Sequence, residues 1–490
     1  MHKKPGWLLF LGLGIFPGVS FTQEPLVSDS SGVVLPLADT LPRTGDLANT
    51  RLSEDDPVYN KRYPVWIPAT RVVLTTAVNW TLARYLYKYE WAKISPETWK
   101  ANLQSKWVWD RDRFGINFIG HPHTGNYYYN VARSNGYGYL QSLPFVAGGS
   151  AVWELFGENE PPSKNDIINT TVSGMFLGEI FYRVSSIILD DRTRGSSRFF
   201  RELLAGLINP PRGFNRLTQG KMFRVTPVEV YQKEPMNITI AGGLHQVNEG
   251  KAFDGGANDI NLSIQFDYGD PFESRRRKPF DVFNFRIESR FGQDRKILDN
   301  VMGQALLLGK NVAKGKHAAL LGLFQHYDYW NHRVFELGTL GLGGGLISRL
   351  RMTPSTVLYS RLYIGGVPLA GYSTRFGPDS SEFRIYNFGG GFETRVEENF
   401  HISKWLSLGL NGYFYWLGTY DGTPGSSTIG ILKPRVTFNF SPSISAGLEH
   451  QVYYHNRYSP ALNDIFLRRT EQRFFLQLFL DHKERKDRYY

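Results

Sequence analysis

The sequence predicts a membrane all-β fold, an antiparallel transmembrane β-barrel of about 12 strands that follows a mainly α-helical domain. Two observations favour this fold. Between residues 236 and 481, segments of roughly ten residues alternate apolar and polar side chains and are separated by turns. Tilted strands that face lipid on one side and a lumen on the other have this pattern. Residues 65–225 instead repeat apolar positions at helical spacing.

The alternation is clearest in the segment 258–268. One face of this predicted strand carries Ile260, Leu262, Ile264, Phe266 and Tyr268. The other face carries Asp259, Asn261, Ser263, Gln265 and Asp267. The mean hydropathy of the whole chain is only −0.32. This low value agrees with a barrel, because half of each strand is polar.

Twelve segments follow the alternating pattern, within a range of roughly ten to fourteen, and an even number is typical of single-chain bacterial barrels. The predicted strands are Asn237–Val247, Asn258–Tyr268, Phe280–Phe291, Met302–Lys310, His317–Tyr329, Arg333–Leu342, Thr356–Gly365, Phe383–Val396, Lys404–Leu417, Thr428–Phe440, Ser443–Tyr454 and Glu471–Asp481. Aromatic residues cluster near strand ends, as in an interfacial girdle. A soluble β-sandwich is the alternative, but it needs only about seven strands in about 100 residues.

The N-terminal residues predict export. A basic start, an apolar core at Trp7–Phe16 and small residues at Gly18–Ser20 are typical of a signal peptide, which we place at residues 1–22. Residues 23–64 are expected to form a flexible periplasmic lead-in, and residues 482–490 a charged tail. The chain has no cysteine, which suits an oxidising compartment. These features predict the outer membrane of a Gram-negative bacterium.

Four helices are predicted before the barrel, at Arg71–Trp91, Ser142–Phe156, Ser163–Leu189 and Ser197–Ile208. In the third helix, Ser163 is placed to cap the first turn. Glu179 and Arg183 of the same helix form an i,i+4 pair. Gly174 and Gly178 form a small-xxx-small pair that would let another element approach closely.

Four short runs in the helical region form a specific combination. They are HPHTGNYYYNVARSNG at 121–136, GSAVWE at 149–154, PSKND at 162–166 and NPPRGFNR at 209–216. Together they resemble the uncharacterised bacterial family called domain of unknown function 3943, over residues 107–220. The resemblance implies an exported protein tied to the Gram-negative envelope, and it implies no established activity.

A hydrolase site is conceivable within these runs. Its candidate residues are His121, His123, Ser134, Glu154 and Asp166, with Ser150 as an alternative nucleophile. Such a site needs a nucleophile, a base and an acid in contact, but no GxSxG nucleophile elbow is present. His121 and His123 have metal-like spacing, but Pro122 between them predicts a turn, and no third ligand has a recognisable spacing. We therefore expect no metal and no cofactor.

The favoured interpretation of the same polar residues is structural, because charged groups on apolar helices must be paired. The predicted hydrogen-bond and salt-bridge network consists of Asn130, Arg133, Asn135, Glu154, Asn165, Asp166, Glu179 and Arg183. A separate group of arginines is predicted either to form a solvated face or to dock to lipid headgroups. This arginine belt consists of Arg192, Arg194, Arg198, Arg212 and Arg216.

The net charge of +11 does not indicate nucleic-acid binding, because no basic helical stripe or nucleic-acid motif accompanies it. The expected partners are outer-membrane lipids, either phospholipid or lipopolysaccharide, and the barrel-insertion machinery during biogenesis. The leading hypothesis is a non-enzymatic outer-membrane protein with an envelope or transport role, whose helical domain lies at the periplasmic mouth or plugs the lumen. The alternative is an outer-membrane lipid-modifying hydrolase of the lipid A deacylase or phospholipase type.

Overall fold

The computed structural model describes residues 61–248, 256–292, 297–332, 334–373, 386–460 and 464–481. The predictions of a signal peptide at 1–22 and of a charged tail at 482–490 lie outside the described residues. Most of the predicted lead-in at 23–64 also lies outside them.

Helices occupy the first half of the described chain. They are α2 (Trp66–Thr81), continued by a π-helical turn at Leu82–Leu86, α3 (Pro96–Gln104), α4 (His121–Arg133), α5 (Leu143–Val152), α6 (Lys164–Ile188), α7 (Gly195–Ile208) and α8 (Pro210–Thr218). Each of the four predicted helical segments overlaps one of these helices. Helices α3, α4 and α8 were not predicted, and each of them has proline at its first or second position. Proline suits that position, because the first turn has no partner for a backbone N–H. The prediction of a turn at Pro122 is therefore wrong, because Pro122 lies in the first turn of α4.

Two predicted features of α6 are present in the structure, namely the cap at Ser163 and the close approach of another helix at Gly174. The Ser163 hydroxyl accepts a hydrogen bond from the Asp166 backbone N–H at 3.3 Å. A Cβ added to Gly174 would lie 2.5 Å from the Gly125 Cα of α4. A Cβ on Gly125 would lie 1.8 Å from the Thr170 carbonyl oxygen. The two helices therefore cross with their backbones in contact, which only glycine permits at these positions.

The second half of the described chain forms twelve strands. They are β1 (Met236–Asn248), β2 (Gly256–Tyr268), β3 (Phe283–Phe291), β4 (Leu298–Ala313), β5 (His317–Asn331), β6 (Glu336–Arg351), β7 (Val357–Ser373), β8 (Asn387–His401), β9 (Leu406–Asp421), β10 (Ser426–Asn439), β11 (Ile444–Tyr458) and β12 (Ile465–Asp481). Consecutive strands pair antiparallel, and β1 pairs with β12 to close the barrel. The predicted fold class and strand number are confirmed.

The alternation of the strands sets the two faces of the barrel wall. On β2, Ile260 is 57% exposed on the outside, whereas Asp259 and Asn261 are buried toward the lumen. The wall is therefore apolar outside and polar inside, as an inserted barrel requires. For the two ends of the barrel, we call the end at which β1 begins and β12 finishes the proximal end, and the opposite end the distal end.

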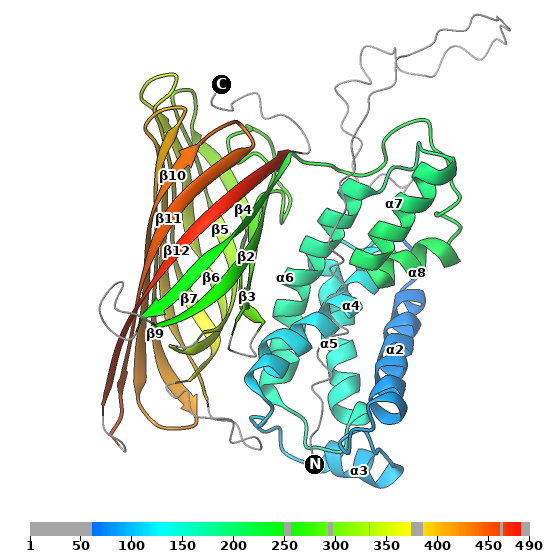
Figure 1. Ribbon diagram of the computed structural model, residues 1–490. Coiled ribbons are helices and arrows are strands. Elements are labelled where there is room, and N and C mark those ends of the chain that lie inside the picture. Colours follow the sequence, from blue (N-terminus) through cyan, green and yellow to red (C-terminus); the bar gives the residue numbers. More distant parts are fainter. Residues whose placement is uncertain are drawn as a thin grey trace, which may run out of the picture.

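The helices stand beside the barrel (Figure 1). Helix α6 runs along the outer wall, and α2, α7 and α8 lie on the side of the helical domain that faces away from the barrel. The expectation that the domain lies at the periplasmic mouth or plugs the lumen is therefore wrong. Among the described residues, no helix is both long enough and apolar enough to cross a membrane.

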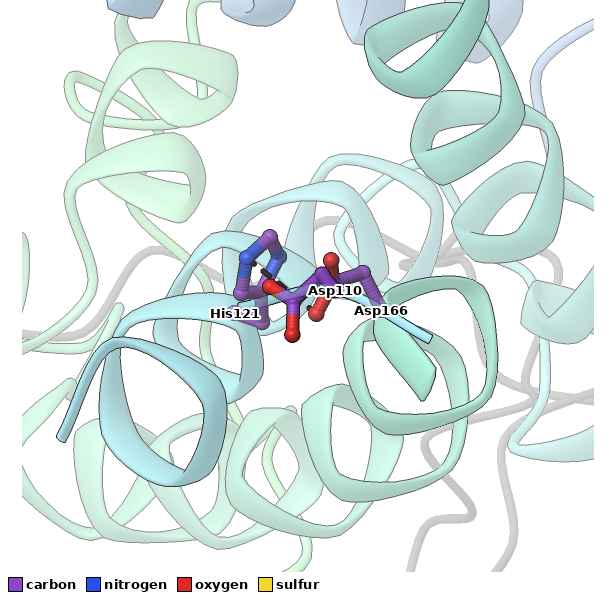
Figure 2. Close-up of side chains that lie close together, drawn as sticks. All are labelled: Asp110, His121 and Asp166. Carbon is purple, nitrogen blue, oxygen red and sulfur yellow. Dashed lines mark ion pairs between the residues drawn. The ribbon is translucent and has the colours of Figure 1, made fainter. Parts of the chain in front are cut away.

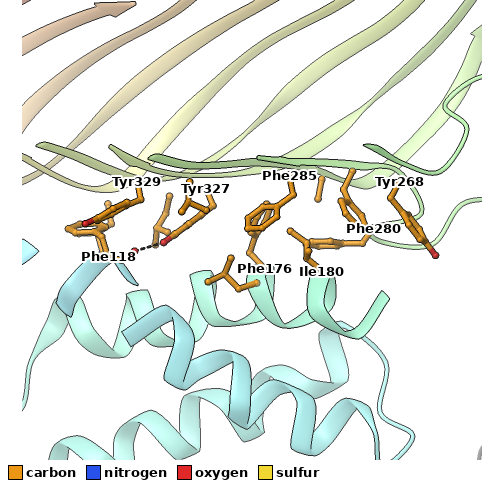
Figure 3. Packing of buried hydrophobic residues seen from close by; sticks show 14 of the residues in the cluster. Phe118, Phe176, Ile180, Tyr268, Phe280, Phe285, Tyr327 and Tyr329 are labelled. Carbon is orange, nitrogen blue, oxygen red and sulfur yellow. Dashed lines mark hydrogen bonds between the residues drawn. The ribbon is translucent and has the colours of Figure 1, made fainter. Parts of the chain in front are cut away.

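Aromatic side chains fill the interface between the helices and the outer wall (Figure 3). Phe176 of α6 stacks on Tyr327 of β5, with ring centroids 5.8 Å apart. Glycines in the wall make room for the helical side chains. A Cβ on Gly338 would lie 2.2 Å from the Phe118 ring, and a Cβ on Gly303 would lie 2.6 Å from the Phe176 ring. Side chains of the helical domain thus fill the spaces that glycines leave in the wall, and the interface is closely packed.

Polar bonds also cross this interface. The Tyr327 hydroxyl donates to the Phe118 carbonyl oxygen. The Tyr139 hydroxyl donates to Gln325 Oε1 at 2.6 Å, and Gln325 Nε2 donates to the Val172 carbonyl at 3.1 Å. These buried bonds require matched partners on both sides, so they fix the orientation of the helical domain on the wall.

Candidate functional site

The polar residues of the helical domain form two groups, of which the first is partly buried and the second is buried. The first, which we call the carboxylate cluster, lies toward the distal end of the barrel. It consists of Asp110, Asp112, Glu154, Glu158 and Asp166 together with His121. It combines residues that precede α4, begin α4, follow α5 and begin α6. The second group is centred on Glu179, in the middle of α6.

His121 is the centre of the carboxylate cluster. Its Nε2 lies 3.4 Å from Asp166 Oδ1, and its Nδ1 lies 3.2 Å from the Thr170 hydroxyl. Figure 2 shows His121 facing both Asp166 and Asp110. Potential ligand atoms of these three residues all lie within 4.8 Å of one another. The sequence missed Asp110, because its position before α4 gives no spacing signal toward His121.

Two asparagines supply hydrogen bonds to the carboxylates. Asn165 Nδ2 donates to Asp110 Oδ1 at 3.1 Å and to Asp166 Oδ1 at 2.9 Å. Asn117 Nδ2 donates to Asp110 Oδ1 at 2.7 Å. Asp110, His121 and Asp166 offer ligand types that a divalent cation accepts. The asparagine amides already satisfy the same oxygens, so the cluster can stand as a hydrogen-bonded network without an ion.

The cluster holds more acidic than basic groups, and this affects their protonation. Burial, reinforced by the neighbouring Asp110, raises the pKa of Asp112 to about 6. Burial raises the pKa of Glu158 well above its usual value, with Glu154 and Asp166 as further causes. A carboxyl group in this setting holds its proton more tightly than one in water. The carboxyl groups of the cluster can therefore keep protons that carboxyl groups in water would lose.

The second group neutralises a fully buried carboxylate. Arg133 Nε of α4 lies 3.0 Å from Glu179 Oε2, and Arg183 Nε lies 2.7 Å from Glu179 Oε1. The Tyr129 hydroxyl also donates to Glu179. Arg183 Nη1 then reaches Asp281, in the connection between β2 and β3, at 3.4 Å. The group joins α4, α6 and the barrel through charges that compensate one another.

The asparagines of the family runs join helices. Asn130 Nδ2 donates to the Gly178 carbonyl of α6 at 3.0 Å, and its Oδ1 accepts from Asn209 Nδ2 at 2.6 Å. Asn135 Oδ1 accepts from Gln219 Nε2 at 2.8 Å. These contacts link α4 to α6 and to the ends of α8. Runs that lie far apart in the sequence therefore meet in one polar core.

The structure brings His121, Glu154 and Asp166 together in the carboxylate cluster, but the candidate nucleophile Ser134 lies elsewhere. Ser134 follows the end of α4 while His121 begins it, and a helix of this length separates them by about 20 Å. The Ser134 hydroxyl donates to the Asn130 carbonyl at 2.5 Å and accepts from Asn215 at 2.6 Å. His123 instead contacts the Tyr127 hydroxyl at 2.9 Å. The hydrolase hypothesis is therefore not supported.

The prediction that the arginine belt is exposed is wrong for three of its five residues. Arg198, Arg212 and Arg216 are buried, with exposed fractions of 9%, 3% and 4%. Arg216 pairs with Asp191 at 2.8 Å and with Glu202 at 2.6 Å. Arg212 is held inward by the Tyr182 carbonyl and two serine hydroxyls of α6. The sequence does not show these partners, because they come from other elements. Arg192 and Arg194 are exposed.

Ion pairs cross the barrel lumen. Arg395 of β8 lies 2.6 Å from Asp328 of β5, and Arg473 of β12 lies 3.0 Å from Glu288 of β3. His332, in the connection between β5 and β6, lies 2.6 Å from Glu471 of β12. None of these pairs joins neighbouring strands. The side chains therefore meet across the interior of the barrel.

The distal lumen is filled by apolar groups. They include Trp330, Phe335, Leu337, Leu417 and Tyr453, all buried in one cluster. Toward the proximal end a cavity of about 290 Å³ remains, and Asp267, Arg361 and Glu397 are among its lining residues. The interior thus has a distal layer rich in aromatic side chains, ion pairs in its distal and middle parts, and a proximal cavity.

A closed antiparallel barrel with an apolar outer wall, joined to a helical domain on that wall, defines a transmembrane barrel protein with a lateral helical module. The helical module can be assigned more closely. Residues 106–211 match the family model described as Domain of unknown function (DUF3943). This match confirms the resemblance inferred from the four sequence runs.

Several solved structures are similar to the chain. The NanC porin is 10% identical, with 49% of this chain and 98% of that chain covered and a TM-score of 0.27. An outer-membrane channel from Pseudomonas putida F1 is 10% identical, with 50% and 96% covered and a TM-score of 0.27. The outer-membrane protein Omp33 of Acinetobacter baumannii is 9% identical, with 51% and 99% covered and a TM-score of 0.20. A comparison with curated proteins finds no match.

Proposed function

We propose that this protein is a non-enzymatic outer-membrane protein whose barrel anchors the helical domain in the envelope and does not conduct solutes. One observation carries the proposal, namely that side chains from opposite parts of the wall meet inside the lumen. Arg361 of β7 pairs with Asp267 of β2 at 2.8 Å, in addition to the pair between Arg395 and Asp328. An open pore needs a continuous water path, and these pairs interrupt it.

The size of the barrel supports the same proposal. Porins of 16–18 strands leave an aqueous channel, whereas the interior of a much smaller barrel can be filled by its own side chains. Opening the lumen here would separate buried charges from their partners, which costs several kcal/mol for each ion left unpaired. The apolar layer around Trp330 and Phe335 adds a second obstruction at the distal end.

The outer wall supports placement in a membrane. Leu448 of β11 and Phe474 of β12 are 60% and 50% exposed, and both face outward. A complete belt of such side chains is unfavourable in water and favourable in hydrocarbon. The outer membrane is the compartment in which barrels of this kind insert, and the exported character of the sequence agrees with it.

Planar-bilayer recordings on the purified full-length protein test the proposal. We expect no stepwise current from the native chain under conditions in which an open porin conducts. The triple variant Trp330→Ala, Phe335→Ala, Arg395→Ala removes side chains from both obstructing layers, so it is expected to conduct. A current through this variant would show that the protein inserts into the bilayer, so the lack of current through the native chain would then result from a closed lumen. A steady open current through the native protein would contradict the proposal.

A further inference from the structure

The helical domain has an outward face whose polarity is opposite to that of a water-soluble domain. Helix α7 shows the inversion clearly. Its exposed side chains include Phe199, Phe200, Leu203 and Leu207. Arg198 and Glu202 of the same helix are buried, and they pair with each other at 2.8 Å. An amphipathic surface helix in water would turn these two groups outward.

Helix α8 repeats the inversion. Phe214 and Leu217 are 48% and 49% exposed. Arg212, Asn215 and Arg216 of the same helix are buried. Arg212 donates to the Tyr182 carbonyl of α6 at 2.7 Å, which directs its charge into the domain. The polar side of α8 therefore forms part of the core, and the apolar side is left outside.

The long α2 segment carries the largest part of this face. Its exposed large apolar residues are Trp66, Val73, Leu74, Val78, Leu82, Tyr85 and Leu86. Its buried residues include Thr76, whose hydroxyl bonds to the Tyr128 hydroxyl at 3.1 Å. Arg71 is held against α8, where it donates to Asn215 at 2.5 Å. The charge of α2 is thus directed toward the core, away from the exposed apolar stripe.

The spacing of the exposed aromatic residues on this segment matches a bilayer. Trp66 and Tyr85 stand 19 residues apart, and a helical rise of 1.5 Å per residue places them about 28 Å from each other. The hydrocarbon core of a bilayer is about 30 Å thick. Tryptophan and tyrosine collect at its two interfaces. Val73, Leu74 and Val78 lie between the two aromatic residues, at the depth of the acyl chains.

The position of the domain indicates what covers this face. The domain stands against the outer wall of the barrel, with α6 on the wall and α2, α7 and α8 on the far side (Figure 1). The uncovered part of the same wall exposes Ile260, Leu448 and Phe474. In an inserted barrel, anything that stands beside the wall replaces lipid at that place. The apolar face of the helices therefore continues the lipid-facing surface of the barrel.

We infer that the outward face of α2, α7 and α8 lies in the same bilayer as the barrel and contacts lipid acyl chains. The inference rests on the proposed membrane location of the barrel. A buried polar core with an apolar exterior suits a domain whose solvent is hydrocarbon, because intramembrane polar groups face the protein interior. Water-soluble monomers rarely expose contiguous apolar patches larger than a few hundred Å².

Site-directed spin labelling tests the inference, and the cysteine-free chain makes single labels straightforward. Full-length protein is reconstituted in phosphatidylcholine vesicles with one label at Val78→Cys on α2 or at Leu203→Cys on α7. Leu448→Cys on the barrel wall is the lipid control, and Lys316→Cys in the turn after β4 is the water control. Collision rates with oxygen, which concentrates in lipid, and with a water-soluble nickel chelate are then compared.

The inference expects oxygen-to-nickel ratios at residues 78 and 203 that match residue 448 and exceed residue 316 several-fold. Ratios that match residue 316, with residue 448 still in lipid, would overturn the inference and leave the membrane location of the barrel intact. Low collision rates with both reagents would show a protein covering, such as a second copy, and would also overturn it. Water-like values at residue 448 would instead overturn the proposed membrane location itself.

Discussion

At the scale of single residues, Glu179 shows how the helical domain tolerates charge in its interior. Its carboxylate is fully buried between Arg133 and Arg183 and receives a hydrogen bond from Tyr129. The i,i+4 spacing in the sequence identifies Arg183 as a partner. Arg133 lies 46 residues earlier in the chain, and only the packing of α4 on α6 brings it to the same carboxylate.

Replacing Glu179 should therefore destabilise the domain strongly. Glu179→Gln removes the buried negative charge that Arg133 and Arg183 share, and breaking such a network costs about 3–5 kcal/mol. Denaturant unfolding of the purified protein in detergent, followed by tryptophan fluorescence, measures this loss. Glu97→Gln on α3 is the matched control, since Glu97 is exposed and should change stability by no more than about 0.5 kcal/mol. Equal effects of the two variants would contradict the role assigned to Glu179.

Asp112 gives the carboxylate cluster a pH dependence. Its pKa is about 6 in the folded chain, against 3.8 for an ordinary aspartate, because of burial and the nearby Asp110. The folded state therefore binds more protons than the unfolded state between these two values. Stability contributed by this group is present below pH 3.8 and is lost as the pH rises to about 6.

The variant Asp112→Asn removes this titration. We expect its stability relative to the native chain to rise between about pH 4 and pH 6 and then to level off, by roughly 2–3 kcal/mol in total. Unfolding curves of both proteins at a series of pH values measure the difference. A difference that stays constant across this range would show that Asp112 does not hold its proton in the folded state.

At the scale of elements, the strands were easier to predict than the helices. A strand repeats its pattern every two residues, and each segment such as β2 carries that signal within itself. Helices α3 and α8 have nine residues each and bury polar residues, and α4 mixes Asn126, Asn130 and Arg133 with apolar residues on its buried side. A search for apolar periodicity therefore overlooks them. Proline at their first or second position is the signal that could have found them.

The fit of the helical domain on β6 gives a test at this scale. A Cβ on Gly338 would lie 2.2 Å from the Phe118 ring, whereas a Cβ on Gly344 of the same strand meets nothing within 4 Å. Gly338→Val should push the domain off the wall, at a cost of about 1–3 kcal/mol for overpacking. Limited proteolysis of residues 61–235 in the reconstituted protein measures the loosening. Gly344→Val is expected to behave like the native chain, and equal protection of both variants would contradict the observed contact.

At the scale of the whole molecule, the barrel and the helical domain share one arrangement of polar and apolar residues. The barrel uses an apolar outer wall and a polar, obstructed lumen. The helical domain has the same arrangement of polarity, with arginine, glutamate and asparagine inside and phenylalanine and leucine outside. Both parts therefore suit one surrounding medium. The family runs lie at the polar centre of the helical domain, and this location explains why they are rich in charged and amide side chains.

The sequence by itself determined the barrel, its strand number and the family to which residues 106–211 are similar. Strand alternation and short motifs are local patterns, so they can be read without knowing which elements meet. Only the tertiary structure decided that the helices stand outside the wall, that Asp110 joins His121, and that three predicted surface arginines point inward. Each of these outcomes depends on contacts between distant segments, and their partners are chosen by the packing of the whole chain.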